Sequence, residues 1–242
     1  MPGAVPGHML WSTLQAWNPS YLSGLEVWLD ASAIEGVAAG GTVSTWDDVS
    51  TNGYAFTSSN SAPTLQLNVF NGYPVVRFDG VDDSVENAAD ATDVANFSIF
   101  AAFIPQATAG NFFISEKGTG TSVNWYLWYN GALQAGFNNG VGFDDHTTAV
   151  TLSSGVGVVW AYVLDDASNL LRMIPNSTED STDETNSAVT TGSQIVNIAS
   201  GRDDANFTEV DVAEMLIYSR ALSTDETILV LDYLSHKYGV ST

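Results

Sequence analysis

The sequence predicts an all-β protein, a sandwich of two antiparallel sheets with one short α-helix at its C-terminal end. Short segments rich in β-branched and aromatic residues recur along the 242 residues and are separated by Asn-Gly and Asp-Gly turns. Apolar residues at helical spacing mark residues 224–238. Because a lone amphipathic helix needs an apolar surface to cover, we expect it to dock on a sheet.

The predicted strands follow one another at the regular spacing of all-β proteins. A hairpin is expected in residues 63–83, with turns at Asn71-Gly72 and Asp79-Gly80. A near-continuous apolar run at 96–104 fits a central strand that is buried on both faces. The remaining strands are expected within residues 24–32, 43–53, 111–118, 123–131, 132–139, 155–166, 169–173, 194–201 and 210–218.

The predicted helix has clear start and stop signals. Ser223 is a favourable N-cap, and Glu226 three residues later completes a capping box. Gly239 is the residue expected where a helix ends in a left-handed conformation. One apolar stripe should face the sheet, made of Ile228, Leu231, Leu234 and Tyr238.

Charge and composition exclude several kinds of partner. The chain has 6 Lys+Arg against 28 Asp+Glu, a net charge of −22, so it lacks the cations that nucleic acid or an anionic membrane surface requires. It has no cysteine, and therefore no disulfide framework. No secretory signal and no apolar run of membrane-spanning length are found, which fits a protein that either stays where it is made or leaves by a route without a cleaved signal, as virion proteins do.

The N-terminal residues differ in character from the rest. Residues 1–20 contain three prolines and two tryptophans, Trp11 and Trp17, and we interpret them as an arm. Tryptophans on an arm favour burial, either on this domain or on a neighbouring subunit. Residues 21–242 are expected to form one sandwich domain.

Four segments, taken in order, carry a resemblance to a known family. They are GLEVWLDAS (24–32), TWDDVSTNG (45–53), NGYPVVRFDGVDD (71–83) and VAEMLIYSRALSTDETILVLDYLSHKYG (212–239). Together they resemble concanavalin A-like lectin/glucanase (laminin G-like) jelly-roll domains of the kind found in phage virion and marine bacterial surface proteins. The resemblance implies two curved sheets whose concave face or rim loops bind glycans, sometimes with calcium.

From this resemblance we predict a noncatalytic virion structural module, a capsid decoration or an appendage protein on the virion surface. The arm would contact other virion proteins in an oligomeric assembly, and the domain would bind host-surface glycans. The alternative is a stand-alone, lectin-like carbohydrate-binding domain, extracellular or on a bacterial cell surface. A third hypothesis is a β-glucan hydrolase, because this architecture also carries enzymes.

The hydrolase hypothesis depends on Glu209, Asp211 and Glu214. They match the E-x-D-x-x-E pattern of laminarinase-type retaining glycoside hydrolases, in which the first Glu is the nucleophile and the last the acid/base. That chemistry needs two carboxylates about 5 Å apart on one face. Strand alternation puts Glu214 on the opposite face unless a bulge intervenes. We therefore favour a structural role, with Glu209 and Asp211 facing solvent or a metal.

The aromatic segment Trp125, Tyr126, Trp128 and Tyr129 is the candidate carbohydrate-binding or partner-binding site. Alternation places Trp125 and Tyr129 on one face of a strand and Tyr126 and Trp128 on the other. One pair then belongs to the core and the other is free to stack on sugars or a partner. The alternative, which we favour, buries both pairs between sheet and loops.

No organic cofactor is expected, and calcium is the metal ion that the composition favours. Acidic pairs in predicted turns offer hard oxygen ligands, although none has EF-hand spacing, and such turns also occur simply solvated in an acidic chain. They are Asp47-Asp48, Asp82-Asp83, Asp144-Asp145, Asp165-Asp166 and Asp203-Asp204. His8, His146 and His236 lack the spacing of transition-metal ligands.

Overall fold

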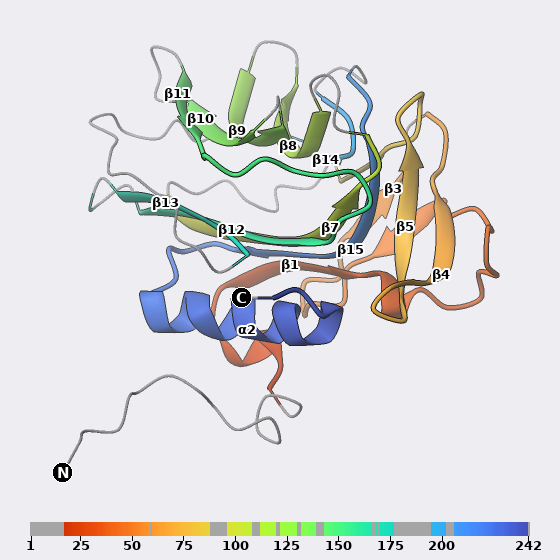
Figure 1. The fold of residues 1–242 in the computed structure, drawn as a ribbon, viewed down its shortest axis with the longest axis horizontal. Coiled ribbons are helices and arrows are strands. Elements are labelled where there is room, and N and C mark those ends of the chain that lie inside the picture. Colours follow the sequence, from red (N-terminus) through yellow and green to blue (C-terminus); the bar gives the residue numbers. More distant parts are fainter. Residues whose placement is uncertain are drawn as a thin grey trace.

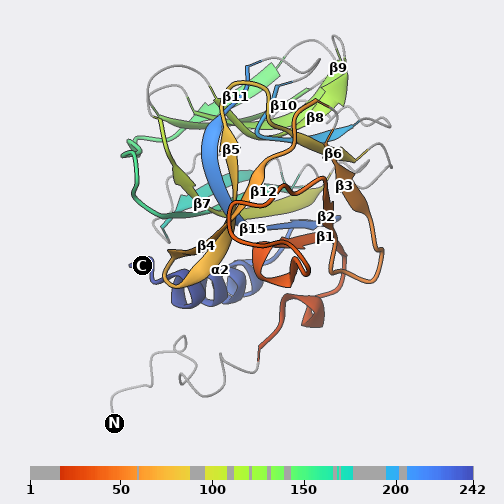
Figure 2. The ribbon, with the colours of Figure 1, turned by 90° about the vertical axis from the view of Figure 1, so that its right-hand side faces the viewer.

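The computed structural model confirms an all-β sandwich (Figure 1). It describes residues 17–58, 60–87, 96–107, 112–119, 122–129, 132–138, 143–165, 168, 170–176, 195–201 and 206–241. Within these ranges two antiparallel sheets face each other, and the helix α2 (Thr224–Tyr238) lies against the outer side of one of them (Figure 2). No helix in those ranges combines the length and the apolar character that a membrane span requires.

The sheet beneath α2, here called sheet A, has seven strands in the order β13-β12-β7-β15-β5-β4, with β1 also paired to β15. Strand β15 therefore occupies its centre: β7 runs along one edge, while β5 and β1 share the other edge end to end. The strands are β1 (Leu25–Asp30), β4 (Thr64–Phe70), β5 (Tyr73–Asp79), β7 (Phe97–Pro105), β12 (Val158–Asp165), β13 (Leu170–Pro175) and β15 (Glu209–Tyr218).

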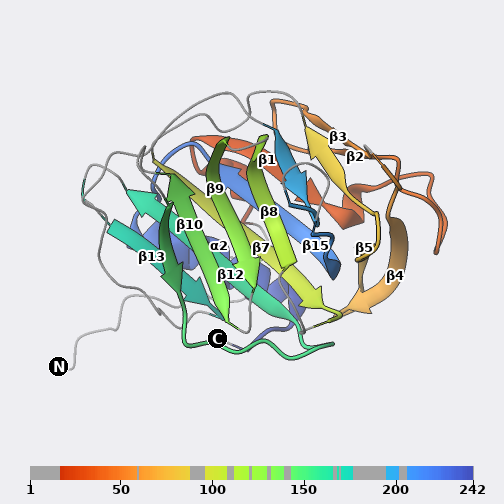
Figure 3. The same ribbon diagram turned by 90° about the horizontal axis from the view of Figure 1, so that it is seen from above.

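The opposite sheet, here called sheet B, has eight strands in the order β11-β10-β9-β8-β14-β6-β3-β2. Figure 3 shows β8, β9 and β10 lying over β7 and β12 of sheet A. Its strands are β2 (Thr45–Asp47), β3 (Ala55–Thr57), β6 (Val85–Asn87), β8 (Phe112–Thr119), β9 (Ser122–Tyr129), β10 (Leu133–Asn138), β11 (Phe143–Thr147) and β14 (Val196–Ile198). Two short 3-10 helices, η1 (Pro19–Tyr21) and η2 (Ala31–Ala33), flank β1.

Strand β7 shows why the apolar run at 96–104 needed cover on both sides. All nine of its residues are buried. Phe97, Ile99 and Phe103 join the core between the two sheets, and Phe100 joins a second cluster between sheet A and α2. Continuous apolar sequence thus corresponds to a central strand between two apolar layers.

Helix α2 keeps the predicted ends, but one residue of its predicted apolar stripe faces solvent. The capping box is present, and Gly239 ends the helix with a φ of 66°. Ile228, however, is 44% exposed, so the predicted stripe is wrong at this position. The docked face shares Leu231, Leu234 and Tyr238 with the predicted stripe and has Thr227 and Val230 in place of Ile228. Its buried members are Thr227, Val230, Leu231, Leu234, Ser235 and Tyr238.

The first turn of α2 is also held by an ion pair. Arg220 donates to both carboxylate oxygens of Glu226, at 2.8 and 2.7 Å. The hydrogen bonds from Arg220, helped by those from Ser223, lower the pKa of Glu226 from 4.5 to about 2. A lowered pKa in the folded state means that this pair stabilises the fold wherever Glu226 is ionised.

This pair predicts a specific contribution to acid sensitivity. Because the folded-state pKa of Glu226 lies below the unfolded value, its stabilisation is complete above pH 4.5 and is lost as the pH falls toward about 2. The variant Glu226→Gln should be less stable than the wild type at pH 7 and should lose less stability across that window. Urea unfolding midpoints measured against pH test this. The exposed Asp225→Asn in the same turn is the control, and equal acid slopes for Glu226→Gln and wild type would contradict the prediction.

Candidate functional site

The outer face of sheet B carries one row of mostly polar positions that crosses the sheet at right angles to its strands. Cα register pairs each position with the next, and strands about 4.8 Å apart give the row a length of about 29 Å. We call it the transverse row. From β3 to β11 its members are Thr57, Glu86, Asn197, Glu116, Tyr126, Gly136 and Asp145.

The flanking residues establish which way this row faces. Val196 and Ile198 on β14, and Trp125 and Leu127 on β9, all belong to the core between the sheets. Since successive residues of a strand alternate between faces, the positions between them lie on the side away from sheet A. The transverse row is therefore on the one broad sheet face that α2 does not cover.

Tyr126 and Trp128 supply the aromatic part of this face. Their ring centroids are 5.9 Å apart at 60°. Tyr126 is buried and Trp128 is partly exposed, so Trp128 is the ring that solvent reaches. Trp125 and Tyr129, which the sequence grouped with them, lie in the core at 1% and 2% exposure. As binding residues those two predictions are wrong, because their face of β9 packs against sheet A.

Asn197 belongs to the same row as Tyr126 and lies on β14, two strands away from β9. Its side chain is 4% exposed, and its Oδ1 has no hydrogen-bond donor among the described residues. Register places it between Glu86 on β6 and Glu116 on β8. A buried amide oxygen without a donor is costly, so this position favours a ligand or solvent hydroxyl that supplies the missing hydrogen bond.

The candidate catalytic carboxylates lie on the other sheet. In β15 the register against β7 shifts between Val212 and Glu214, which marks a bulge at Ala213. The bulge turns Glu214 toward α2, on the same face as Asp211. The strand alternation predicted opposite faces in the absence of a bulge, so the bulge reverses that expectation for Glu214.

Glu214 is nevertheless closed off beneath α2. Its side chain is 0% exposed. Oε1 accepts hydrogen bonds from Trp28 Nε1 at 2.7 Å and Tyr233 OH at 2.9 Å. Oε2 accepts from Lys237 Nζ at 2.7 Å and Tyr238 OH at 2.8 Å. No substrate oxygen can approach a carboxylate whose oxygens are both occupied and buried.

The charge state of this cluster follows from its contacts. The pKa of Glu214 is raised, first by burial and also by the charge of Asp30, while Lys237 and the hydroxyl of Tyr238 oppose that rise. All four contacts of the carboxylate are donors, an arrangement that suits the ionised form. Lys237 also pairs with Asp30 at 2.7 Å. We call these groups, Trp28, Asp30, Glu214, Tyr233, Lys237 and Tyr238, the helix-anchoring network.

The other two members of the motif have equally structural surroundings. Asp211 is buried and accepts two hydrogen bonds from Arg77, both at 2.7 Å, and a third from Gln106 Nε2 at 2.8 Å. Glu209 is exposed at the start of β15. The three carboxylates thus do not converge on an open groove, and the pattern is explained by the packing of sheet A.

Removing the cation of the helix-anchoring network should strongly destabilise the protein. Lys237→Met leaves the buried charge of Glu214 without its counter-ion, which costs about 3–5 kcal/mol. Adding Glu214→Gln to the same chain should recover part of that loss. The free energy of unfolding in urea measures both effects. Glu209→Gln, on the same strand but exposed, should stay within about 0.5 kcal/mol of wild type. A Lys237→Met variant as stable as wild type would contradict an ionised Glu214.

The acidic turns are mostly occupied by the protein's own hydrogen bonds. Asp48 accepts from the backbone of Trp28, Ser50 and Tyr54. Asp144 and Asp145 lie on β11 and Asp165 ends β12. Asp166, Asp203 and Asp204 lie outside the described residues.

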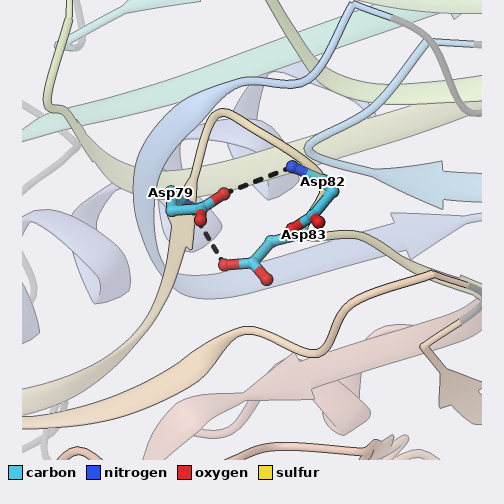
Figure 4. A group of neighbouring side chains, drawn as sticks. All are labelled: Asp79, Asp82 and Asp83. Carbon is cyan, nitrogen blue, oxygen red and sulfur yellow. Dashed lines mark hydrogen bonds between the residues drawn. The ribbon is translucent and has the colours of Figure 1, made fainter.

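One acidic group gathers in the turn after β5 (Figure 4). Asp79, Asp82 and Asp83 each bring one carboxylate oxygen to within 4.8 Å of the others. Asp79 Oδ1 accepts from Val81 N at 2.8 Å and Asp82 N at 3.4 Å, and Asp83 Oδ2 accepts from Asp79 N at 3.1 Å. Burial raises the pKa of Asp83. These bonds fix the turn by themselves, so calcium binding stays a prediction of the sequence.

A metal titration tests that prediction. If the Asp79–Asp83 turn binds calcium, millimolar CaCl2 should raise the melting temperature relative to EDTA, and Asp82→Asn should remove the increase because the site loses one anionic ligand. Asp225→Asn, an exposed acid on α2, should keep the increase. Identical melting curves in calcium and EDTA would reject the site.

The histidines and the arm add no second site among the described residues. His236 Nδ1 lies 2.7 Å from the carbonyl oxygen of Asp232, and His146 is on β11. His8 and the arm residue Trp11 lie outside the described ranges. Trp17 packs 5.6 Å from the ring of Tyr233. The described end of the predicted arm thus rests on its own domain.

No protein-family model and no curated protein matches this sequence. Solved structures do match it in fold. The binding domain of Paraclostridial Mosquitocidal Protein 1 has a TM-score of 0.62 at 14% identity, over 88% of this chain and 52% of its own. Trypanosoma rangeli sialidase in complex with sialic acid has a TM-score of 0.60 at 15% identity, over 91% of this chain and 34% of its own.

A third match is nearly complete in both directions. Domain 4 of AbnA, a GH43 extracellular arabinanase from Geobacillus stearothermophilus solved with arabinotriose, has a TM-score of 0.56 at 13% identity. The match covers 86% of this chain and 98% of that domain. At such low identities the likeness establishes the β-sandwich fold and no more. The narrower concanavalin A-like family stays a prediction.

Proposed function

We propose that this protein is a noncatalytic, lectin-like module that binds carbohydrate on the outer face of sheet B. The observation that carries the proposal is that the Tyr126–Trp128 ring pair shares the outer face of sheet B with the transverse row, in which backbone register places Glu116 next to Tyr126 and Asn197, with its undonated amide oxygen, one strand further. Sugars offer apolar C–H faces for aromatic rings and hydroxyls for amide and carboxylate groups. A row that combines both chemistries suits such a ligand.

The charges of the row narrow the ligand to neutral glycans. Glu86, Glu116 and Asp145 are acidic, and no row position is basic. The whole chain carries a net charge of −22, which further disfavours an anionic ligand at this face. Sialylated or uronic acid-containing glycans should therefore bind there less well than neutral oligosaccharides.

Related folds support carbohydrate as the ligand class. Similar structures were solved with sialyllactose, sialic acid and arabinotriose. Because those proteins share only the fold, they support the proposal as analogies. The buried surroundings of Glu214 and Asp211 support the absence of glycoside hydrolysis at β15.

A position on a virus particle, as a capsid decoration or an appendage, is compatible with a glycan-binding module and stays a prediction of the sequence resemblance. So does assembly with other virion proteins through residues 1–20. Mass spectrometry of purified particles from the source of this gene tests both: the protein should copurify with virions.

The binding proposal is tested by removing the solvent-facing ring. Trp128→Ala should weaken binding of a neutral oligosaccharide at least about tenfold, a loss of about 1.4 kcal/mol. A glycan array identifies the ligand, and calorimetry measures its affinity for each variant. Tyr21→Ala removes an aromatic ring that is 69% exposed on η1, and it should bind like wild type. An array without any binding, with and without calcium, would reject the proposed function.

A further inference from the structure

A second candidate site lies on the opposite side of the molecule, where the N-terminal end of α2 meets β12 and β13. A pocket of about 280 Å³ opens there. Val163, Leu170 and Leu222 form its apolar wall, and Ser223 and Thr224 form an exposed rim. This pocket is unrelated to the transverse row, because it lies on the α2 side of sheet A.

Arg172 is the more buried of the two arginines that line this pocket, and it has no counter-ion among the described residues, whereas Arg220 is paired with Glu226. The side chain of Arg172 reaches the α2 side of β13, since Leu171 and Met173 belong to the core between the sheets. It is 6% exposed. Its Nη2 donates to Leu222 O at 2.8 Å and Thr227 Oγ1 at 3.3 Å, and its Nη1 donates to Thr224 Oγ1 at 3.2 Å. All three acceptors are neutral.

The Nε–H donor of Arg172 is unused. A guanidinium has five N–H groups, and its Nε has no acceptor among the described residues. Nearby partial charges do not compensate the cation either. The N-terminal end of a helix carries a partial positive charge, so α2 adds to the positive potential at Arg172. A buried cation at this place is unfavourable unless an anion joins it.

The two acids of the pocket do not fill that role. Glu226 is held by Arg220 in a two-bond ion pair at the first turn of α2. Asp165 is partly exposed at the end of β12 and makes no ion pair with Arg172. Because both carboxylates repel negative charge, a ligand with two or more negative charges is disfavoured. A ligand with one negative charge matches the one unpaired cation, Arg172.

We propose that this pocket binds a small organic monocarboxylate, with the carboxylate at the guanidinium of Arg172 and the hydroxyl of Thr224. The apolar wall would cover the carbon atoms of the ligand. A carboxylate accepts charge-assisted hydrogen bonds from a guanidinium, and the N-terminal end of α2 favours the same charge. The ligand would neutralise Arg172 and so link β13 to α2.

The test uses the full chain with sodium acetate and sodium glucuronate, each compared with sodium chloride at equal ionic strength. Isothermal calorimetry and thermal unfolding are the readouts. We expect saturable binding and a higher melting temperature with at least one carboxylate. Acetate alone would identify a small organic acid as the ligand type, and glucuronate alone would identify an acidic sugar.

Matched variants locate the binding. Arg172→Gln should lower the affinity at least tenfold, whereas Ile228→Ala, which changes an exposed side chain of α2 outside the pocket, should retain it. Ala221→Trp, which fills the pocket and leaves Arg172 in place, should also abolish binding. This second variant tests the proposal if Arg172→Gln does not fold. The proposal is overturned if neither carboxylate binds, if chloride produces the same shift, or if both pocket variants bind like wild type.

Discussion

The carboxylate of Glu214 is the contact on which the arrangement of sheet A and α2 depends. Donors from β1 and from two turns of α2 converge on its two oxygens, so one buried side chain joins three elements. Apolar packing of Val230, Leu231 and Leu234 brings the helix to the sheet, and the network fixes its position along and around its own axis. Once α2 is fixed in this way, it covers Glu214 and the outer side of β15.

The completeness of this network makes the exceptions elsewhere informative. Buried polar groups in folded proteins nearly always have partners, because an unmet donor or acceptor loses its contacts with water without compensation. Glu214 and Asp211 follow this rule fully. Asn197 and Arg172 each have one buried atom without a partner among the described residues, as have several other side chains such as Trp46, Trp160 and Ser235. Asn197 and Arg172 lie on opposite sides of the molecule, one on the outer side of sheet B and one in the pocket beside α2.

Local sequence signals predicted the elements well, and the sites poorly. The capping box at Ser223 and the apolar run of β7 depend on neighbouring residues, which is why both could be recognised in advance. The bulge at Ala213 could not, because it reflects how β15 fits β7, and it alone decides which face Glu214 occupies. Lys237 stands in the last turn of α2, where a cation suits the helix dipole, but its ammonium group lies in the buried network.

The transverse row shows the same limit more strongly. Its members come from seven strands, and Asn197 meets Glu116 and Glu86 only through pairing between segments distant in sequence. Nothing in the residues around Asn197 signals that position. The aromatic segment of β9 could be recognised from the sequence. Which of its two faces is buried could not, because that depends on the side of β9 on which sheet A packs.

The central position of β15 has a consequence for how the domain assembles. It pairs with β1, β5 and β7, all of which precede it in the sequence. During synthesis on the ribosome, these three strands emerge first and must wait with open edges for a common neighbour. Formation of sheet A is thus a late, long-range event, the kind that folds slowly and exposes strand edges to other chains in the interval.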